Sequence, residues 1–271
     1  MRVACVGMCS GDEIAGNVAD ASRLIREAHG LGAELIATPE MTTLMDQRSG
    51  ALARKAKTED EDEGLQAFRL LAAELGIWLI AGSLPIRISE TRYANRCYLI
   101  DPEGNTSAVY DKIHMFDVEL SDGQVYRESA KFQPGEHAVV ARTGLGHLGL
   151  TICYDLRFSY LYRALAQAGA EVLFVPAAFT RVTGEAHWHV LLRARAIETG
   201  SFVVAPAQGG RHADGRETYG HSLIIGPWGD IMAEGGVGPG VIVADLDRAA
   251  VKDARYRIPA LRHDRPFLPP V

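Results

Sequence analysis

The sequence has little of what marks a membrane, secreted or nucleic-acid-binding protein. None of its apolar runs approaches the roughly 20 residues that a membrane-spanning helix needs. Residues 1–6 look like a first strand and have no cationic stretch leading into a longer apolar one, so we expect no signal peptide and a cytoplasmic protein. A formal net charge of −6 disfavours nucleic acid as the main partner.

Metal-binding and phosphate-binding patterns are also missing. The four cysteines are scattered along the chain, at Cys5, Cys9, Cys97 and Cys153. Such isolated cysteines are expected to be reduced thiols. His187 and His189 lack the i, i+4 spacing of a helical metal pair. Residues 144–149 match the spacing G-x-G-x-x-G but lead into a predicted strand rather than out of one, so we interpret them as a turn. We expect no metal and no cofactor.

What is present is typical of one α/β domain spanning residues 1–271. The apolar content of 47% and charged content of 23% suit a globular enzyme with a sizeable core. Short apolar runs predict strands at 3–8, 34–38, 77–83, 94–100, 106–111, 148–153, 172–176, 202–207, 222–226 and 240–245. A hairpin is expected around residues 227–230. The strands should form a mixed sheet, or two sheets.

Helices are predicted where apolar residues recur with a 3.6-residue period. Two such faces lie within residues 14–28 and 65–75, and glycines such as Gly76 and Gly200 follow predicted helices where these should end. A third apolar face is formed by Val190, Leu191, Ala194 and Ile197. These helices should cover the sheet on both sides.

Cys153 stands at the most informative point of the chain. The apolar run that ends at Cys153 is followed at once by a helix-like segment at 159–168, which predicts a strand-to-helix turn. There the sulfur would be exposed and the next backbone N–H groups would be free to bind an anion. The alternative is a small hydrophobic core residue. Because polar residues begin immediately after Cys153, we interpret it as a nucleophile beside an oxyanion site.

Three charged residues occupy comparable positions. Glu40 and Lys112 each follow a predicted strand, and Glu128 lies in an irregular segment between strands. The carboxyl ends of strands are where α/β proteins build active sites. Taken singly, each residue would be interpreted as a solvated surface charge rather than a catalytic group.

The order of these residues resembles that of a known family. Pro39-Glu40, the segment 110–114 and the segment 152–158 occur in the order of the Glu, Lys and Cys motifs of the nitrilase superfamily of carbon–nitrogen hydrolases. Further matching blocks lie at 176–179, 183–188, 191–198, 219–222, 227–230 and 262–266. They resemble the Nit branch. Two positions depart from its usual pattern, since Ser159-Tyr160 replaces Pro-Glu and His189 replaces Glu.

The resemblance implies a fold and a set of roles. It implies a four-layer α-β-β-α sandwich with two mixed sheets flanked by helices, assembled as a homodimer or higher homo-oligomer. It implies hydrolysis of an amide through a thioester on Cys153, with Glu40 as general base and Lys112 as charge stabiliser. Glu128 would hold Lys112 and the substrate amide. The Lys112 ammonium and the Tyr154 N–H would hold the oxyanion.

The substrate implied by the resemblance is a small amide that carries carboxylates, with deaminated glutathione first. The residues expected around it are His114, Tyr154, Arg157, Phe179 and Thr183. Arg157 could instead form a structural ion pair with Asp155 or another carboxylate, and His221 is expected to be structural.

Other functions stay open at this point. The first is an ω-amidase acting on α-ketoglutaramate or α-ketosuccinamate. The second is a non-catalytic binding protein on the same fold, which the intact set of Glu40, Lys112 and Cys153 disfavours. A Cys–His hydrolase that uses His187 or His221 is the third, and neither histidine follows a strand in a way that suggests contact with Cys153.

Overall fold

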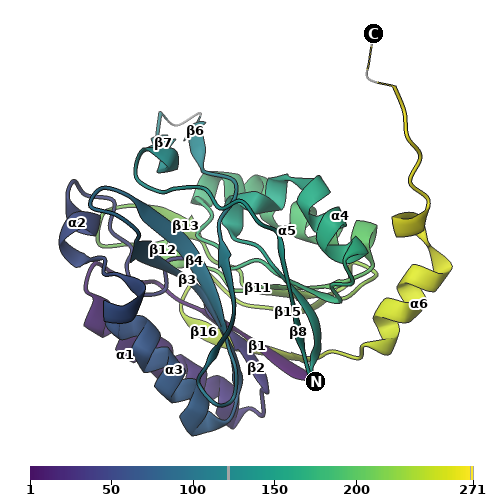
Figure 1. Ribbon diagram of the computed structural model, residues 1–271, viewed down its shortest axis with the longest axis horizontal. Helices are drawn as coiled ribbons and strands as arrows, with labels where there is room; N and C mark the ends of the chain where they lie inside the picture. The colour runs from purple at the N-terminus through teal and green to yellow at the C-terminus, as the bar shows by residue number, and fades with distance from the viewer. Residues whose placement is uncertain (121–122, 269, 271) are drawn as a thin grey trace.

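Two six-stranded sheets form the centre of the molecule (Figure 1). The computed structural model describes residues 1–120, 123–268 and 270. The first sheet has the strand order β16 (Gly240–Asp245), β1 (Arg2–Gly7), β2 (Leu35–Ala37), β3 (Trp78–Arg87), β4 (Tyr93–Ile100) and β5 (Thr106–Asp111). In the second the order is β15 (Ile231–Glu234), β14 (Leu223–Ile225), β11 (Phe202–Ala205), β10 (Val172–Phe174), β9 (Gly146–Leu150) and β8 (Val139–Thr143).

Each sheet is mixed, with three parallel strands and antiparallel strands beside them. Strands β1, β2 and β3 run parallel in the first sheet, and β9, β10 and β11 in the second. Two small hairpins stand apart from the sheets: β6 (Asp117–Glu119) with β7 (Val125–Arg127), and β12 (Gly209–Arg211) with β13 (Glu217–Tyr219). Parallel strands have their carboxyl ends at one edge, where a site can be assembled.

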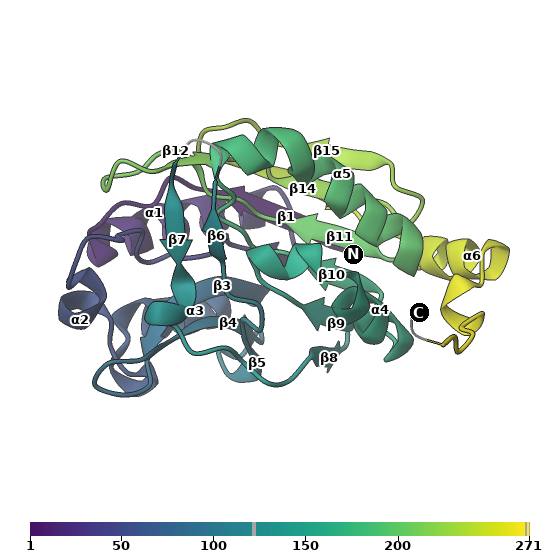
Figure 2. The same cartoon turned by 90° about the horizontal axis from the view of Figure 1, so that it is seen from above.

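Helices cover the outer faces of both sheets, as Figure 2 shows. Helices α1 (Ile14–Gly30) and α3 (Glu63–Leu75) pack on the first sheet, and α4 (Ser159–Gln167) and α5 (Arg181–Thr199) on the second. The shorter helices are α2 (Ala51–Lys55), α6 (Ala249–Arg257), η1 (Glu59–Glu61), η2 (Glu128–Ala130), η3 (Cys153–Arg157) and η4 (Ala260–Arg262). This confirms the predicted four-layer α-β-β-α sandwich. No helix in the described ranges is long and apolar enough to cross a membrane.

Side-chain alternation along β1 explains the layering. Val3 and Cys5 pack between the two sheets, in the same buried cluster as Leu150 and Phe174 of the second sheet. Ala4 and Val6 point the other way, into the cluster under α1 and α3. Successive strand residues face opposite sides, so a strand buried on both sides needs an uninterrupted apolar run. This is why these strands were predictable.

The predicted strands are present, with shifted ends and with omissions. Strand β9 ends at Leu150 rather than at Cys153, because the chain turns into η3 there. The sequence analysis did not identify β6, β7, β8, β12 and β13, most of which are three residues long and partly exposed. The turn predicted at residues 144–149 is confined to residues 144 and 145, because 146–149 belong to β9. The hairpin predicted around 227–230 joins β14 to β15. Gly76 and Gly200 end α3 and α5 in the left-handed conformation that favours glycine.

The predicted apolar face of α5 was wrong at two of its four positions, since Leu191 and Ala194 are half-buried and Leu191 packs against the core. Val190 and Ile197 are 69% and 55% exposed, whereas Trp188 and Leu192 are buried. Arg195 is also buried, because its guanidinium donates to the Leu156 carbonyl at 2.7 and 2.9 Å. Helix α5 has two apolar stripes, and tertiary packing selects the one that contains the large tryptophan.

Candidate active site

The four predicted catalytic residues converge at the carboxyl ends of strands. Glu40 lies three residues after β2, Lys112 directly after β5, and Cys153 three residues after β9. Glu128 is the first residue of η2, just after β7. All four line one cavity. The structure therefore brings together residues that are widely separated in the sequence.

Lys112 is the centre of a buried charge cluster. Its ammonium donates to Glu40 Oε1 at 2.9 Å and to Glu128 Oε1 and Oε2 at 3.0 and 2.8 Å. Its side chain is only 2% exposed. Burial would lower the pKa of Lys112, but the carboxylates of Glu128 and Glu40 hold that pKa well above its usual range. Lys112 is thus a permanent buried cation.

Glu40 is held as an ionised carboxylate. Burial alone would raise the pKa of Glu40, but the Lys112 charge and hydrogen bonds from Cys153, Lys112 and Asn95 outweigh burial and lower it. The other oxygen, Oε2, accepts the backbone N–H of Ala178 at 2.9 Å. Glu40 is therefore a fixed, charged hydrogen-bond acceptor beside the thiol.

Asn95 is a member of the cluster that sequence reasoning missed. Its Nδ2 donates to Glu40 Oε1 at 2.8 Å and to Glu128 Oε1 at 3.0 Å. The residue is fully buried on β4. An asparagine within a strand pattern gives no local sign that it bridges two carboxylates. Asn95 and Lys112 together fix the distance between Glu40 and Glu128.

Cys153 occupies a tight strand-to-helix turn with an unusual backbone conformation. Its φ of 49° lies in the left-handed region that non-glycine residues rarely adopt. The Cys153 N–H donates to the Pro176 carbonyl at 3.0 Å, which holds the turn. The residue is only 6% exposed, so the expectation of an exposed sulfur was wrong. Cys153 is one of the residues that line the cavity.

The electrostatics of Cys153 favour the neutral thiol at rest. Burial and the negative charge of Glu40 raise the pKa of Cys153 well above its ordinary value, although Lys112 acts in the opposite direction. Glu40 is thus the carboxylate that acts most strongly on the thiol. A neutral thiol needs a base before it can act as a nucleophile, and Glu40 is the carboxylate at hand in this cluster.

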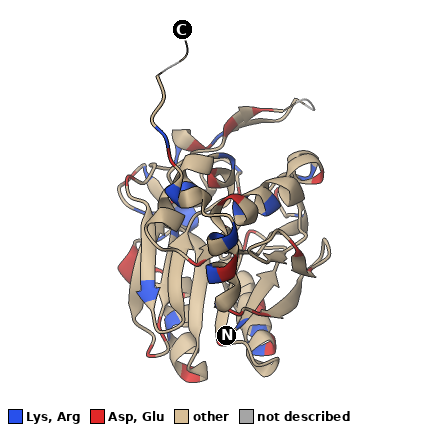
Figure 3. Ribbon diagram, turned by 90° about the vertical axis from the view of Figure 1, so that its right-hand side faces the viewer, with Lys and Arg blue, Asp and Glu red and all other residues tan. Residues whose placement is uncertain are grey.

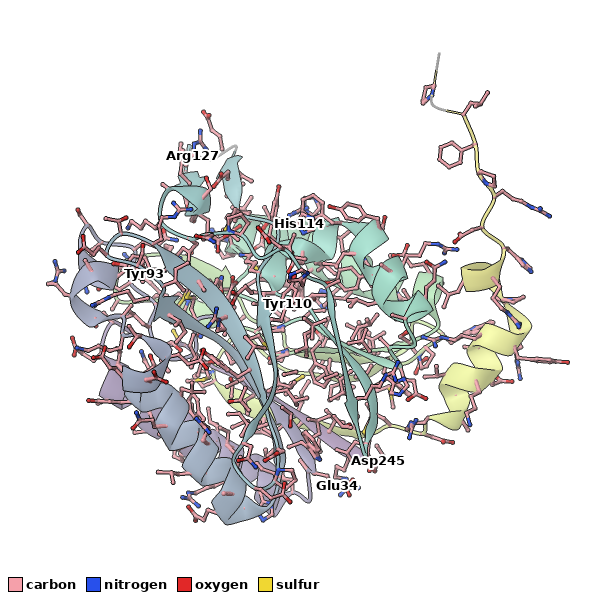
Figure 4. All side chains as sticks on the ribbon, viewed as in Figure 1. Glu34, Tyr93, Tyr110, His114, Arg127 and Asp245 are labelled. Atoms are coloured by element: carbon pink, nitrogen blue, oxygen red, sulfur yellow. The ribbon has the colours of Figure 1, made fainter. Side chains whose placement is uncertain are left out.

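A buried aspartate supports the turn from behind. Asp155 accepts the Tyr110 hydroxyl at 2.6 Å, the His114 N–H at 3.0 Å and the Ile152 N–H at 2.9 Å. Its Oδ1 is also 2.7 Å from His114 Nδ1. Tyr110 and His114 flank Lys112 in the chain, and Figure 4 shows both near the middle of the molecule. Asp155 thus ties the cysteine turn to the lysine segment.

This network changes two of the sequence-based interpretations. His114 is stacked on Phe158 with ring centroids 3.6 Å apart and does not line the cavity, so its predicted contact with substrate is not supported by its position. Asp155 is fully engaged with Tyr110, His114 and the turn, so the alternative of an ion pair with Arg157 was wrong. His114 and Asp155 therefore hold the cysteine turn against the lysine segment.

The cavity above Cys153 has a volume of about 250 Å³. Of the residues predicted to contact substrate, Tyr154, Phe179 and Thr183 line it. Arg157 lies behind them, with its guanidinium carbon 5.8 Å from the centre of the Tyr154 ring and 5.5 Å from that of Phe179. Both guanidinium nitrogens of Arg157 are 3.3 Å from His187 Nδ1. Within the described ranges, Arg157 pairs with no carboxylate.

Three cations at the cavity were not predicted. Arg127, Lys131 and Arg216 all line it, and we call them the cationic rim. Arg127 stands on the β6–β7 hairpin (Figure 4), and its guanidinium donates to the backbone carbonyls of Val118 and Tyr126. Lys131 has no ion pair among the described residues, and Arg216 pairs with Asp214.

Each acidic residue of the cavity has a cationic partner within the protein. Glu40 and Glu128 pair with Lys112, as described above. Asp46 pairs with Arg48 and Lys55, and Glu217 pairs with Arg181. Two of the lining cations, Arg127 and Lys131, have no ion pair in the described ranges. Over the molecule as a whole, Figure 3 shows cationic and anionic residues interspersed along the chain. An anionic group on a bound molecule would find uncompensated cations here.

Comparison with known proteins agrees with this geometry. The profile of the family described as carbon–nitrogen hydrolase matches residues 2–256. The chain is 41% identical over 270 residues to deaminated glutathione amidase of Yersinia enterocolitica, covering 97% of this chain and 93% of that one.

Solved structures show the same fold. The Caenorhabditis elegans NitFhit protein superposes with a TM-score of 0.90 at 34% identity, and the match covers 97% of this chain and 65% of the worm protein. An amidase from Nesterenkonia superposes with a TM-score of 0.81 at 28% identity, over 95% of each chain. That structure is a mutant with the acetamide moiety of fluoroacetamide added covalently at its active-site cysteine. The chain therefore belongs to the carbon–nitrogen hydrolase family of the nitrilase superfamily, and it is an amidase.

Proposed function

We propose that this amidase acts through a covalent thioester on Cys153. The observation that carries the proposal is the buried cluster in which Lys112 holds Glu40 and Glu128 beside the Cys153 thiol. A neutral thiol beside an ionised carboxylate has the pairing of nucleophile and general base that amide hydrolysis needs. The labelled cysteine of the Nesterenkonia amidase supports a nucleophilic role for cysteine in this fold.

The first half of the reaction forms the thioester. As the Cys153 sulfur attacks the amide carbon, its proton moves to Glu40. The carbonyl oxygen becomes an oxyanion, held by the Lys112 ammonium and the Tyr154 N–H. The Tyr154 N–H is available for this role because it has no acceptor within the described ranges. When the C–N bond breaks, Glu40 returns the proton to the departing amine. The products of this half are the free amine and the acyl group on sulfur.

The second half releases the acid. Glu40, again ionised, takes a proton from water as the water oxygen attacks the thioester carbon. The same donors stabilise the second oxyanion, and collapse of this intermediate expels the sulfur, which recovers its proton from Glu40. Glu128 keeps Lys112 in place through both halves and is positioned to accept the amide N–H of the substrate. The two halves together consume one water molecule and return Cys153 and Glu40 to their starting protonation states.

For the substrate, we propose a small amide with carboxylates, and deaminated glutathione first. This molecule carries one carboxylate on its acyl side and one on its amine side. The cationic rim supplies partners for one, and Arg157, which has no acidic partner in the described ranges, supplies positive charge for the other. The relative named deaminated glutathione amidase, 41% identical to this chain, supports the same choice.

Steady-state kinetics with two amides tests the substrate. Deaminated glutathione and α-ketoglutaramate share their acyl side, but only the first has a carboxylate on the amine side. We expect a higher kcat/KM for deaminated glutathione, and Lys131→Met should remove part of that preference while leaving α-ketoglutaramate unaffected. A higher kcat/KM for α-ketoglutaramate would favour the ω-amidase alternative.

We also propose that the protein assembles as a homodimer through the exposed apolar stripe of α5. Val190 and Ile197 on this helix and Trp228 after β14 are each more than half exposed. Exposed large apolar residues in a cluster are typical of interaction surfaces. Light scattering after size-exclusion chromatography should give twice the chain mass for the parental protein and the monomer mass for Val190→Lys. A monomeric parental protein would overturn this proposal.

A further inference from the structure

We propose that His189, His221 and Glu234 form a binding site for a divalent transition-metal ion such as Zn²⁺. The three residues come from α5, from the turn before β14 and from β15. None of them is among the residues lining the catalytic cavity described above. The proposal is therefore independent of the amide chemistry at Cys153, and it revises the expectation, drawn from histidine spacing, that the chain binds no metal.

The distances between ligand atoms are close to those of a metal site. His189 Nε2 and His221 Nδ1 each lie 3.0 Å from Glu234 Oε1, and the three ligand atoms all lie within 4.8 Å of one another. Zinc binds imidazole nitrogen and carboxylate oxygen at about 2.0–2.2 Å in tetrahedral geometry, which puts neighbouring ligand atoms about 3.3 Å apart. The two nitrogen–oxygen distances need to lengthen by only a few tenths of an ångström.

The ligand set has the right chemistry. Two imidazoles and one carboxylate suit zinc and neighbouring transition metals better than calcium or magnesium, which prefer oxygen ligands. Three protein ligands also leave a fourth position for water. The His189, His221 and Glu234 side chains are 29%, 27% and 39% exposed, so an ion and a water molecule can reach them.

The surrounding structure holds the ligands in place before any ion arrives. His221 has a φ of 53°, and its backbone is fixed by hydrogen bonds from its N–H to the Gly236 carbonyl and from the Trp188 indole to its own carbonyl. Its ring stacks on Tyr219 at 4.4 Å, and the His189 ring meets Tyr219 edge-on at 5.9 Å. Binding would therefore cost little additional ordering of side chains.

Sequence spacing could not reveal this site. Glu234 is 45 residues from His189 and 13 residues from His221. The three residues come together because α5 packs against β13 and β14, and β15 pairs with β14. The same contacts could instead be purely structural, with Glu234 Oε1 accepting hydrogen bonds from the His189 and His221 rings. A direct metal titration separates these two functions.

The test is a titration of the metal-free protein with Zn²⁺ by calorimetry, and with Co²⁺ followed by its visible ligand-field bands. We expect one ion per chain in the parental protein and a rise in melting temperature with Zn²⁺. Loss of a second-sphere partner typically costs 10–100-fold in metal affinity. Removal of a direct ligand in His189→Gln or Glu234→Gln should therefore weaken binding by at least about 100-fold and abolish the thermal shift.

Two control variants keep the result unambiguous. His187→Gln removes the same residue type from the same helix, two positions from His189, and should leave the affinity unchanged. Cys153→Ala removes the cavity thiol, which could itself bind zinc, and should also leave it unchanged. Binding that survives in His189→Gln but disappears in Cys153→Ala would overturn the proposal. So would a parental protein that binds no Co²⁺ or Zn²⁺ in a saturable way.

Discussion

Replacing Lys112 by methionine should make the stability of this protein fall as pH rises. Lys112 is the buried cation that pairs with both Glu40 and Glu128, at 2.8–3.0 Å. Methionine fills a similar volume without the charge. Removing one partner of a buried ion pair typically costs about 3–5 kcal/mol, because the remaining charge is left without compensation. For a domain of this size that corresponds to a melting temperature lower by roughly 6–20 °C.

The direction of the pH dependence follows from the pKa of Glu40. In the parental protein that pKa is lowered, so the group stabilises the fold above its unfolded pKa of about 4.3, and this stabilisation is lost as pH falls. In Lys112→Met the buried carboxyl groups lose their main counter-charge, so their folded pKa should exceed the unfolded value. The variant is then most stable at a pH below the unfolded-state pKa of these carboxyl groups. It loses stability as the pH rises through their folded-state pKa.

The assay is urea unfolding of both proteins at pH 5 and pH 8. The free energy of unfolding lost in Lys112→Met should be larger at pH 8 than at pH 5. Each pKa unit is worth about 1.4 kcal/mol, so a total rise of roughly two to four units in the pKa of the buried carboxyl groups accounts for the expected loss. Lys131→Met is the matched control, since Lys131 lines the same cavity without an ion pair in the described ranges, and it should change stability by less than about 1 kcal/mol at either pH. An equal loss at both pH values would refute the reasoning.

Three further predictions concern turnover. Cys153→Ala should abolish amide hydrolysis with an unchanged circular dichroism spectrum, whereas Cys97→Ala should keep most activity, and near-parental turnover by Cys153→Ala would exclude the thiol mechanism. Glu128→Gln should keep its fold but lose kcat by about 10²-fold or more, because Lys112 is no longer held for the oxyanion; an unchanged kcat would remove Glu128 from the mechanism. The methyl ester of a carboxylate-bearing amide should have a kcat/KM about 10–150-fold below that of the free acid, as expected for a lost charge-assisted hydrogen bond of about 1.5–3 kcal/mol. In Arg157→Lys the difference in kcat/KM between acid and ester should be smaller. Equal kcat/KM for acid and ester in the parental enzyme would refute carboxylate recognition.

The layers of the fold could be predicted because they depend on local patterns. A strand such as Val172–Phe174 is apolar on both faces, and this alone indicates burial between two layers. The positions of Glu40, Lys112 and Cys153 after strand ends were likewise visible in the sequence. Parallel strands with their carboxyl ends at one edge then account for their convergence.

The partners that complete the site could not be predicted, because they are far apart in the chain. Asn95 reaches Glu40 across 55 residues, and Asp155 meets His114 across 41. His114 looked like a substrate contact because it shares a strand end with Lys112, but packing turns it toward Asp155. The cationic residues of the rim belong to hairpins and turns, where no periodicity distinguishes a cavity residue from a solvated one.

The covalent role of Cys153 can be measured directly by rapid-quench mass spectrometry. The enzyme is mixed with excess deaminated glutathione, quenched with acid within the first turnover, digested and analysed, while the amine released is measured in the same samples. The account predicts that the peptide containing Cys153 gains the mass of one acyl group during the initial burst of amine and loses it when substrate is exhausted. A burst of one amine per chain with the Cys153 peptide unmodified would contradict it.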